Sequence, residues 1–401
     1  MGKFNKGGYL GGFDQLRAPD APTLGTITVG DEQLQVPITA PSYSTGTIAY
    51  YCATAIGGGV SIGAESTSSP VTITGLTNGT EYTVSGVVKS EYGSSPSSAT
   101  STATPSEPSW TGARAVFSGG SGGDGATVNI IEYVTIASTG NTTDFGDLTG
   151  TTRLSAAISN STTGLIAALF DGSTRTDTID KITIASAGNA SDFGNLTEAK
   201  FGVMGVSNGI RGVFAGGQTA SGYSNVMEYV TIASDGNGTD FGDLSNNNSG
   251  SSTKGGESNS ATRGVFAGGF NQNVMEYITI ASTGDVTDFG DLTVARYGIS
   301  GFGSATRGCY AGGFTSSRSN VIDYITIAST GNATDFGDLT AAKIVQGSGA
   351  SNLSRGLIAG GDAPDNQYQN VIEYITISST GNGTDFGDLS AIRVEVAATS
   401  G

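Results

Sequence analysis

Residues 370–390, NVIEYITISSTGNGTDFGDLS, have five near-copies earlier in the chain, and this repetition decides the fold. Successive copies are 47 to 50 residues apart, measured at the Asp of the Asp-Phe-Gly triplet: Asp144, Asp192, Asp240, Asp288, Asp335 and Asp385. Repeats of this length are typical of folds in which each repeat is one supersecondary unit that buries its faces against its neighbours. The strands of one repeat therefore have to be identified first.

One repeat, residues 295–339, contains four strand-like segments. They read RYGISGFGS, RGCYAGG, NVIDYITIAS and TDFGDL, and clusters of Gly, Ser and Asn separate them. The third segment alternates, with Val321 and Asp323 on one face and Ile322 and Tyr324 on the other, so both faces carry bulk. Four strands with two bulky faces indicate one blade of a β-propeller, because each blade packs between two others.

The two ends of the repeat region predict how the blades close. The first repeat opens at residues 113–120, ARAVFSGG, without an inner strand of its own, while residues 391–401, AIRVEVAATSG, leave one spare strand. We expect the C-terminal strand to be the innermost strand of the first blade, which removes two exposed sheet edges. The expected blade repeats are about 112–149, 151–197, 199–245, 247–293, 294–340 and 341–390, with the closing strand at 391–400.

Four positions recur within each repeat. A basic residue before the inner strand is Arg153, Lys200, Lys254, Arg296, Lys343 or Arg393. A diglycine after the second strand starts at Gly119, Gly216, Gly268, Gly312 or Gly360. The third strand has Tyr133, Tyr229, Tyr277, Tyr324 or Tyr374, and the fourth has Phe145, Phe193, Phe241, Phe289, Phe336 or Phe386. Over about residues 112–401 this pattern resembles the kelch or galactose-oxidase-type β-propeller, with Phe where the family usually has Trp. The resemblance implies six blades.

The second repeat departs from this pattern. It reads GLIAALFDG where the other repeats have RGVFAGG or a close variant, and Lys181 replaces the Tyr. Two interpretations stay open, namely a structural variation of one blade or a local functional site.

Residues 19–105 have a different pattern, with alternating runs of about six residues separated by turns, which predicts a seven-strand sandwich. In the segment LTNGTEYTV, Leu76 and Tyr82 resemble the leucine and corner tyrosine of fibronectin type III domains, whose tyrosine hydroxyl binds nearby backbone. Ile38 stands where that family has its core Trp. The resemblance implies an all-β chain, a fibronectin type III-like sandwich followed by a six-bladed propeller, with the sandwich as a spacer or adhesive module.

The segments outside these two domains are short. Residues 1–18 interleave Gly pairs with Phe4, Tyr9, Leu10 and Phe13 and cannot form a core, so we expect a docking arm that becomes ordered against a partner. Residues 106–111 are expected to be a linker.

Composition excludes several classes of function. The chain has 401 residues with 35 acidic and 18 basic side chains, a net charge of -17 and no His. Such a surface repels nucleic acid and anionic lipid, and a chain without His lacks the commonest general base and transition-metal ligand. The sequence contains no apolar run of about 18 residues, so we expect no membrane insertion. The N-terminus lacks the apolar region of a secretory signal, so we expect none. Cys52 and Cys309 fall in different domains and are expected to be small buried hydrophobes rather than a disulfide.

Acidic residues of the repeat allow three interpretations. The third strands carry Glu132, Asp180, Glu228, Glu276, Asp323 and Glu373. A ring of carboxylates can hold a cation, but we expect ion pairs with Arg114, Arg211, Arg263, Arg307 and Arg355, because an unpartnered buried carboxylate is costly.

The paired Asp144 and Asp147 allow calcium binding, although turn capping explains them as well. For catalysis, Glu198, Glu257 and Glu395 are the only irregular carboxylates near inner strands. We expect no catalytic residue, cofactor or metal.

The wording IDYITIASTGNATDFGDLT, residues 322–340, is similar to predicted structural proteins of marine, particularly cyanobacterial, bacteriophages. This resemblance implies a non-enzymatic virion surface protein, either a tail fibre or adhesin component or a decoration protein, released by lysis without an export signal. We expect docking to other virion proteins through residues 1–18, several copies per particle, and a propeller presented to the host surface, with a glycan as its ligand. The alternatives are an architectural subunit that bridges neighbours and a polysaccharide-active enzyme.

Overall fold

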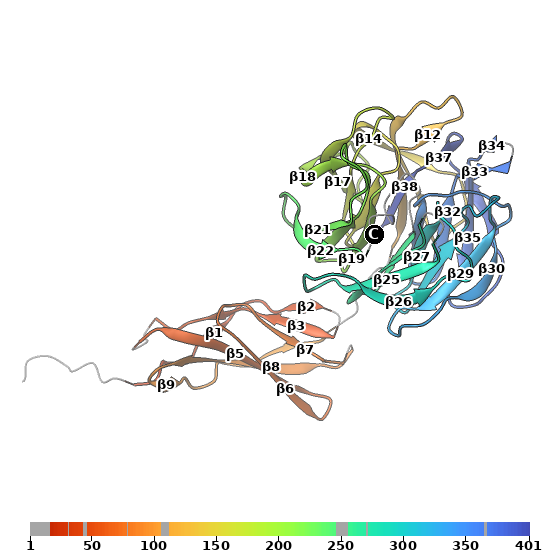
Figure 1. Ribbon diagram of the computed structural model, residues 1–401. Helices are drawn as coiled ribbons and strands as arrows, with labels where there is room; N and C mark the ends of the chain where they lie inside the picture. Colours follow the sequence, from red (N-terminus) through yellow and green to blue (C-terminus); the bar gives the residue numbers. More distant parts are fainter. Residues whose placement is uncertain are drawn as a thin grey trace, which may run out of the picture. The chain divides into compact units, whose positions relative to one another are not determined.

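The computed structural model describes residues 17–30, 32–42, 46–77, 79–105, 112–245, 256–269, 272–364 and 367–401. These residues form antiparallel β-sheets and contain no α-helix, so the all-β prediction is confirmed and none of them belongs to a membrane-spanning helix. The chain divides into two compact units, Met1–Glu107 and Pro108–Gly401 (Figure 1). The predicted docking residues Phe4, Tyr9, Leu10 and Phe13, the linker 106–111 and Lys254 lie outside the described residues.

The described residues of the first unit form ten strands in three sheets. In the largest sheet β10 (Ser101–Ala103), β8 (Tyr82–Ser90), β5 (Ile48–Gly57) and β6 (Val60–Ser66) are neighbours in this order, and β9 (Gly93–Ser94) also pairs with β8. The second sheet has the order β2 (Thr28–Gly30), β3 (Gln33–Val36) and β7 (Val71–Thr74). The third pairs β1 (Thr23–Leu24) with β4 (Ile38–Thr39).

The core of the first unit lies between the alternating inward side chains of these strands, including Ile38. Tyr82 and Leu76 are buried in it, and the Tyr82 hydroxyl accepts a hydrogen bond of 3.0 Å from the backbone N–H of Thr77. Alternation also corrects one prediction. Because Ala53 faces the core, Cys52 faces outward, where its Sγ lies 3.8 Å from Glu65 Oε2 and is only half-buried.

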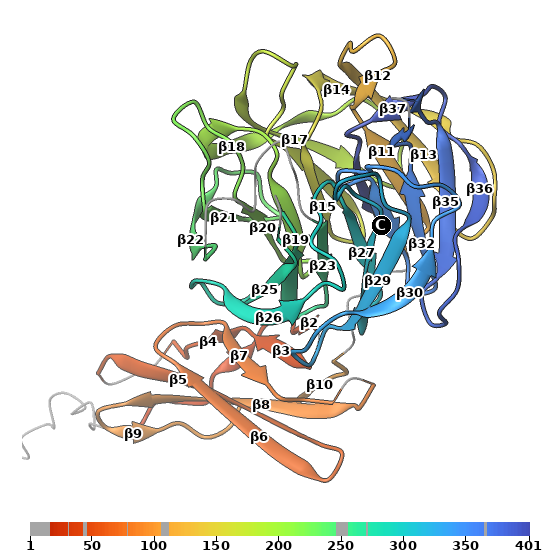
Figure 2. The ribbon, with the colours of Figure 1, turned by 45° about the vertical axis from the view of Figure 1, so that its right-hand side comes forward.

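In the second unit, the described part of the chain forms six four-stranded antiparallel sheets, which we call repeat sheets 1 to 6 (Figure 2). From the inner to the outer strand, sheet 1 consists of β38 (Ala397–Ser400), β11 (Arg114–Ser118), β13 (Val128–Thr135) and β14 (Thr143–Thr152). Sheet 2 consists of β15 (Ala156–Ser159), β16 (Thr163–Ala167), β17 (Thr176–Thr183) and β18 (Ser191–Lys200). Sheet 3 consists of β19 (Met204–Ser207), β20 (Arg211–Ala215), β21 (Val226–Thr231) and β22 (Thr239–Asp243).

The remaining repeat sheets follow the same order. Sheet 4 consists of β23 (Gly256–Asn259), β24 (Arg263–Ala267), β25 (Val274–Thr279) and β26 (Thr287–Asp291). Sheet 5 consists of β27 (Ser300–Gly303), β28 (Arg307–Ala311), β29 (Val321–Thr326) and β30 (Thr334–Asp338). Sheet 6 consists of β31 (Gly349–Ser351), β32 (Arg355–Ala359), β35 (Val371–Thr376) and β36 (Thr384–Asp388). Two short pairs, β12 (Ser121–Gly122) with β37 (Arg393–Val394) and β33 (Asp362–Ala363) with β34 (Gln367–Tyr368), complete the unit.

The inner strands contact one another in cyclic order, from β38 through β15, β19, β23, β27 and β31 and back to β38. The strand that begins this cycle is C-terminal, and it pairs with β11 at the start of the unit, with Phe117 opposite Ala398. The first and last repeats are therefore joined by a sheet ladder.

A turn between the third and fourth strands of each repeat sheet binds the outer strand of the preceding sheet. Between sheets 2 and 1, the Gly188 N–H donates to the Phe145 carbonyl at 2.7 Å, and Asn189 Oδ1 accepts the Asp147 N–H at 3.0 Å. The residues that accept this N–H in the six sheets are Asn141, Asn189, Asn237, Asp285, Asn332 and Asn382. We call this contact the turn clasp, and it links all six sheets, including sheet 1 to sheet 6.

The Gly of the Asp-Phe-Gly triplet makes the turn clasp possible. Gly146 has a φ of +146°, and a Cβ atom there would lie 2.5 Å from the carbonyl oxygen of Gly188 in the next sheet. The same φ region is found at Gly194, Gly242, Gly290, Gly337 and Gly387. The triplet recurs because only Gly allows both the conformation and the close approach of the next turn.

The acid in the third strand of a repeat sheet forms a buried ion pair at the entry of the chain into that sheet. Glu373 binds Lys343 Nζ at 2.7 Å, with side-chain exposures of 1% each, and also accepts the Thr340 N–H at 2.6 Å. The corresponding ion pairs are Lys200 with Glu228, Arg296 with Asp323, and Arg393 with Glu132. Ion pairing of these acids is thus found, but with other partners than predicted.

The predicted pairing of these acids with the arginines of the second strands is wrong, because the arginines stack on tyrosines instead. The arginines are Arg114, Arg211, Arg263, Arg307 and Arg355. The Arg114 guanidinium lies 4.3 Å from the ring centroid of Tyr133 and donates to the Ile184 carbonyl of the next sheet at 3.0 Å. Tyr133 meets the buried Phe145 edge-on, with ring centroids 6.0 Å apart. The equivalent Tyr–Phe pairs are Tyr229 with Phe241, Tyr277 with Phe289, Tyr324 with Phe336, and Tyr374 with Phe386.

Sheet 2 lacks both of these arrangements. Thr163 stands in place of the stacking Arg, and Lys181 binds Asp235 at 2.5 Å instead of forming a Tyr–Phe pair; Phe193 keeps its buried position. No basic residue of the described chain pairs with Asp180, which accepts hydrogen bonds from the N–H and hydroxyl of Thr149 at 2.8 and 2.7 Å. Burial raises the pKa of Asp180, and the Thr149 hydrogen bonds offset part of this effect.

The turn clasp predicts a difference between two glycine substitutions. Gly146→Ala strains a left-handed φ and drives a methyl group into the Gly188 carbonyl, so we expect a loss of about 2–4 kcal/mol in the free energy of unfolding. Gly188→Ala meets open space and is the matched control, expected within about 0.5 kcal/mol of wild type. Urea denaturation measures both, and equal effects would contradict the clasp.

The ion pairs predict a second difference. Glu373→Gln leaves the buried Lys343 without a counter-charge and should destabilise by about 3–5 kcal/mol. Asp180→Asn should change stability by less than about 1 kcal/mol. No base loses its partner there, and because burial raises the pKa of Asp180, its ionised carboxylate does not add stability relative to the unfolded chain. The same denaturation experiment tests both variants; a larger loss in Asp180→Asn than in Glu373→Gln would refute this account.

Candidate functional site

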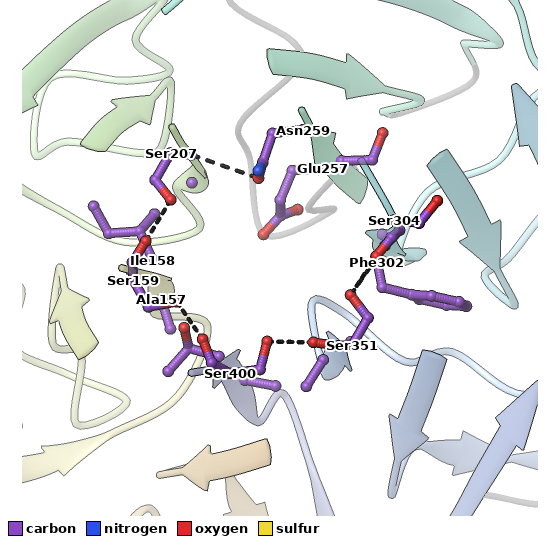
Figure 3. Close-up of a pocket in the computed structure, with 18 of the residues that line it drawn as sticks. Ala157, Ile158, Ser159, Ser207, Glu257, Asn259, Phe302, Ser304, Ser351 and Ser400 are labelled. Atoms are coloured by element: carbon purple, nitrogen blue, oxygen red, sulfur yellow. Dashed lines mark hydrogen bonds between the residues drawn. The ribbon is translucent and has the colours of Figure 1, made fainter. Parts of the chain in front are cut away.

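A polar pocket opens where the six inner strands end, and we call it the axial pocket (Figure 3). Its cavity has a volume of about 80 Å³. The inner strands read AATS, AAIS, MGVS, GESN, SGFG and GAS, so they present mostly small side chains. Small residues allow the strands of six sheets to approach one another, and the space left between their ends is the pocket.

The last residues of the inner strands form a hydrogen-bonded belt around this pocket. Ser207 Oγ donates to the Ser159 carbonyl at 2.6 Å, and Ser159 Oγ donates to the Ser400 carbonyl at 2.7 Å. Ser400 Oγ donates to the Ser351 carbonyl at 2.6 Å, and Ser351 Oγ donates to the Gly303 carbonyl at 2.7 Å. The belt joins neighbouring sheets and commits the hydroxyl protons of four serines, and Ser351 Oγ also accepts a hydrogen bond from the Gly303 N–H at 3.2 Å.

The belt is irregular at sheets 4 and 5, where Asn259 and Gly303 replace Ser. Asn259 Oδ1 lies 3.5 Å from the backbone nitrogen of Ser207. Glu257, two residues before Asn259 on β23, directs its carboxylate toward the pocket (Figure 3). Gly301 is required on the adjacent strand, because a Cβ there would collide with the Glu257 backbone. Among the lining residues, all of which lie in described parts of the chain, Glu257 is the only one that ionises.

The three irregular carboxylates are not brought into one site. Glu198 is exposed on the outer strand β18, whereas Glu257 lies in the axial pocket. Glu395 lies before β38, at the end of the chain segment opposite to the Ser400 end, and forms a 3.5 Å ion pair with Arg153. Glycoside hydrolysis uses two carboxyl groups about 5–10 Å apart, and the axial pocket presents one.

The sequence did not predict which residues surround Glu395. Glu395 has a φ of +61°, a strained conformation for a residue other than Gly, and burial raises its pKa while Arg153 offsets part of the rise. Nearby, Arg153 lies 5.4 Å from the ring centroid of Phe170, which stacks on Phe201 at 4.2 Å. The second repeat departs at Ala168 and Leu169, which replace the diglycine, whereas Phe170 has counterparts in Phe270 and Phe314. Ala168 and Leu169 are both buried, and Ala168 has a φ of +64°.

The carboxylates of the DFGD segments are the candidate calcium ligands of the sequence. Within the described ranges, no group of three or more acidic or cysteine side chains is placed to hold a metal ion. Asp147 contributes its backbone N–H to the turn clasp. The buried thiol of Cys309, whose pKa is raised to about 12 by burial, is not a reactive nucleophile.

Comparisons with known proteins give no relative on which to base a function. No protein-family model and no curated protein matches the chain. The site therefore has to be interpreted from its own geometry: a small, neutral-to-acidic pocket, lined by hydroxyl and backbone groups, at the end of a cyclic arrangement of sheets.

Proposed function

We propose that this chain is a non-enzymatic recognition protein on the surface of a bacteriophage particle. In this proposal the second unit is a six-bladed, kelch-like β-propeller, and the first is a fibronectin type III-like sandwich that serves as a spacer. Residues 1–18 dock to other virion proteins, and several copies are carried per particle. The propeller is presented to the host surface, where it binds a glycan.

The axial pocket is the observation that carries the proposal. It combines committed hydroxyl groups, backbone polar groups and one carboxylate in a cavity of about 80 Å³. Polar groups held by a hydrogen-bonded belt are preorganised for a hydroxylated ligand, because little side-chain freedom is lost on binding. The departures from the repeat at Glu257, Asn259 and Gly303 fall at this pocket, whereas all six outer strands keep the DFG triplet and five of them the full TDFGD wording.

Two further observations support the architecture. The inner strands contact one another in cyclic order, and the C-terminal strand pairs with β11 at the start of the unit. This is the arrangement expected of blades joined by the two ends of the chain. In the first unit, the hydrogen bond between the Tyr82 hydroxyl and the Thr77 backbone has the geometry of a tyrosine corner.

An architectural subunit is the second candidate. It is favoured by Ile56 and Val60, which flank the turn between β5 and β6 and are 57% and 48% exposed. Ile56 is opposite Ser61 and Val60 is opposite Gly57, so the two side chains lie on opposite faces of the hairpin tip. Exposed apolar side chains at such a tip suit contact with a neighbouring protein. An architectural role predicts particle incorporation without glycan binding.

The proposal is tested with the full-length protein on an array of bacterial surface polysaccharides. Leu353, 48% exposed on the pocket rim, and Ile392, 45% exposed and outside the pocket, give matched variants. We expect Leu353→Arg to change or abolish glycan binding and Ile392→Arg to leave it intact, since both add one charge to an exposed aliphatic position.

Antibodies raised against residues 112–401 should label intact phage particles in the same study. Labelled particles together with binding to no polysaccharide would favour the architectural candidate. Absence of the protein from particles would overturn the proposal, and equal effects of the two variants would remove the axial pocket from it.

A further inference from the structure

The stacked rings of Phe170 and Phe201 are flanked by a second arginine, Arg175, directly before β17. Its guanidinium lies 5.1 Å from the ring centroid of Phe201 and 6.0 Å from that of Phe170. Its Nε is buried without a hydrogen-bond partner, and the guanidinium forms no ion pair within the described part of the chain. Arg175 is half-buried, so it is a cation held by aromatic rings and open to solvent.

The acids nearest to Arg175 in the sequence do not pair with it. Asp171 Oδ1 accepts the N–H groups of Thr174 and Ser173 at 2.6 and 2.8 Å, and these hydrogen bonds lower the pKa of Asp171 to about 2. Asp177 lies on β17, at a position where the pairing with β18 is interrupted. Among the described residues, neither carboxylate forms an ion pair with the guanidinium.

Sheet 5 shows what an arginine at this position binds. Arg318 forms an isolated bridge with Phe314, as Arg175 does with Phe170, so the two arginines occupy the same position of their repeats. Arg318 Nη2 donates to Asp362 Oδ2 at 2.8 Å, and its Nε donates to the Asp362 carbonyl at 3.1 Å. Asp362 lies between the second and third strands of sheet 6. The arginine of this position therefore binds a carboxylate that the following sheet supplies.

The sheet that follows Arg175 supplies an amide instead. Asp362 exchanges two backbone hydrogen bonds with Ile344, at 2.9 and 3.0 Å, and this contact fixes its place in sheet 6. In sheet 3 the same exchange joins Gln218 to Phe201, at 2.8 and 3.2 Å, so Gln218 occupies the place of Asp362. Arg175 lies against Phe201, directly opposite this uncharged residue. The arrangement that joins sheets 5 and 6 is thus present between sheets 2 and 3 without its carboxylate.

The same register explains why Arg153 lies beside Arg175. The Arg153 N–H donates to the Phe170 carbonyl at 2.9 Å, as the N–H of Phe201 does in sheet 3, so Thr152 occupies the buried position of the base. The base of sheet 2 is therefore displaced by one residue from the interior. Arg153 lies 5.4 Å from the ring centroid of Phe170 and pairs with Glu395 at 3.5 Å. Two guanidinium groups flank one phenylalanine ring, and in the described chain only one of them has a carboxylate partner.

We propose that Arg175 binds the carboxylate of an acidic sugar, a uronic acid of a surface polysaccharide, in the place that Asp362 has beside Arg318. A guanidinium presents parallel N–H donors that match the two oxygens of a carboxylate, and such charge-assisted hydrogen bonds are stronger than neutral ones. The site lies where the inner strands begin, whereas the axial pocket lies where they end, so it is additional to that pocket. Its ligand class rests on the proposed glycan recognition.

The side chains next to Arg175 favour a sugar over an acidic side chain of a protein. The Gln218 amide has donors and an acceptor for a hydroxyl group. Tyr223 is opposite Gln218 in an isolated bridge and is 46% exposed, so it presents a ring on which the C–H face of a sugar packs. A hydroxylated ring with one carboxylate is complementary to these three side chains.

The charge of the chain favours a carboxylate over a phosphate. The net charge of -17 opposes each negative charge that a ligand adds. A carboxylate carries one negative charge, whereas a phosphate monoester carries about 1.5 to 2 at pH 7. A single carboxylate is sufficient to neutralise Arg175.

Ligand-observed NMR titration of the full chain with methyl glucuronide and methyl glucoside tests the site. The two sugars differ only in a carboxylate against a hydroxymethyl group, so we expect the glucuronide to bind about tenfold more tightly. Arg175→Gln should remove this preference. Arg17→Gln removes one positive charge from an exposed position of the first unit and should retain it.

A reciprocal variant keeps the test valid if Arg175→Gln misfolds. Gln218→Asp supplies the carboxylate that sheet 6 has at this position, so we expect it to pair with Arg175 and to lower glucuronide binding to the level of the glucoside. Gln367→Asp adds the same charge to an exposed position of β34 and should leave the preference unchanged. An undiminished preference in either folded variant of the site would overturn the proposal.

The remaining outcomes separate the ligand from the proposed function. Tighter binding of the α-amide of N-acetylaspartic acid than of the glucuronide would replace the sugar with a protein carboxylate, and tighter binding of glucose 6-phosphate would replace the carboxylate with a phosphate. Either result overturns the proposal, as does equal binding of the two methyl sugars, whereas loss of array binding in Leu353→Arg would still support the proposed function. Glucuronide binding through Arg175 without any polysaccharide bound on the array would support this site and overturn recognition at the axial pocket.

Discussion

The outer strand of every repeat sheet has one edge that no strand covers, and the second unit depends on how that edge is satisfied. In each case the turn of the next sheet supplies the missing partners, as Gly188 and Asn189 do for Phe145 and Asp147. Because each sheet receives this contact from one neighbour and gives it to the other, no sheet is complete alone. The wording that repeats most closely, TGN followed by TDFGD, contains both partners of the contact.

The buried ion pairs add a second constraint, which acts on the path of the chain between sheets. A paired charge in the interior contributes little net stability, but a charge left unpaired there costs several kcal/mol, so the pair disfavours any other arrangement. Side-chain lengths are matched in three pairs: the shorter Lys200 and Lys343 meet glutamates, and the longer Arg296 meets the shorter Asp323. Arg393 with Glu132 is an exception to this matching. The pairs position the connection that leads into each inner strand, and hence the strand itself.

Sequence periodicity was sufficient to predict strands, because alternation and turn residues act over a few positions. It did not identify the partners of the acids. In sheet 1, Arg114 is opposite Thr135 and Phe117 is opposite Glu132, so Arg114 and Glu132 are an odd number of positions apart and face opposite sides. Tyr133, diagonal to Arg114, is on the same face and becomes its partner. Without the strand register, the sequence cannot show whether Arg114 pairs with Glu132 or stacks on Tyr133. The burial of Cys52 was predicted wrongly for the same reason.

The axial pocket could not be predicted from any local pattern. Its belt joins residues far apart in the chain, such as Ser159 and Ser400, which are separated by 241 positions. The sequence did single out Glu257 as irregular, but grouped it with Glu198 and Glu395, because proximity to an inner strand along the chain says nothing about which end of the strand a side chain reaches. Register and cyclic order separate the three.

The two edges of each repeat sheet differ in how strongly their contacts restrict the amino-acid sequence. Outer strands keep their Gly because the next turn approaches the backbone there, and substitution of this Gly affects two sheets at once. Inner strands are held by backbone carbonyls that accept belt hydroxyls, an arrangement that any residue can provide on the acceptor side. Gly303 demonstrates this, since its carbonyl accepts the Ser351 hydroxyl although it has no side chain of its own. The inner edge therefore accepts residues that depart from the repeat, such as Asn259 and Gly303, while the belt contacts of the other sheets are kept.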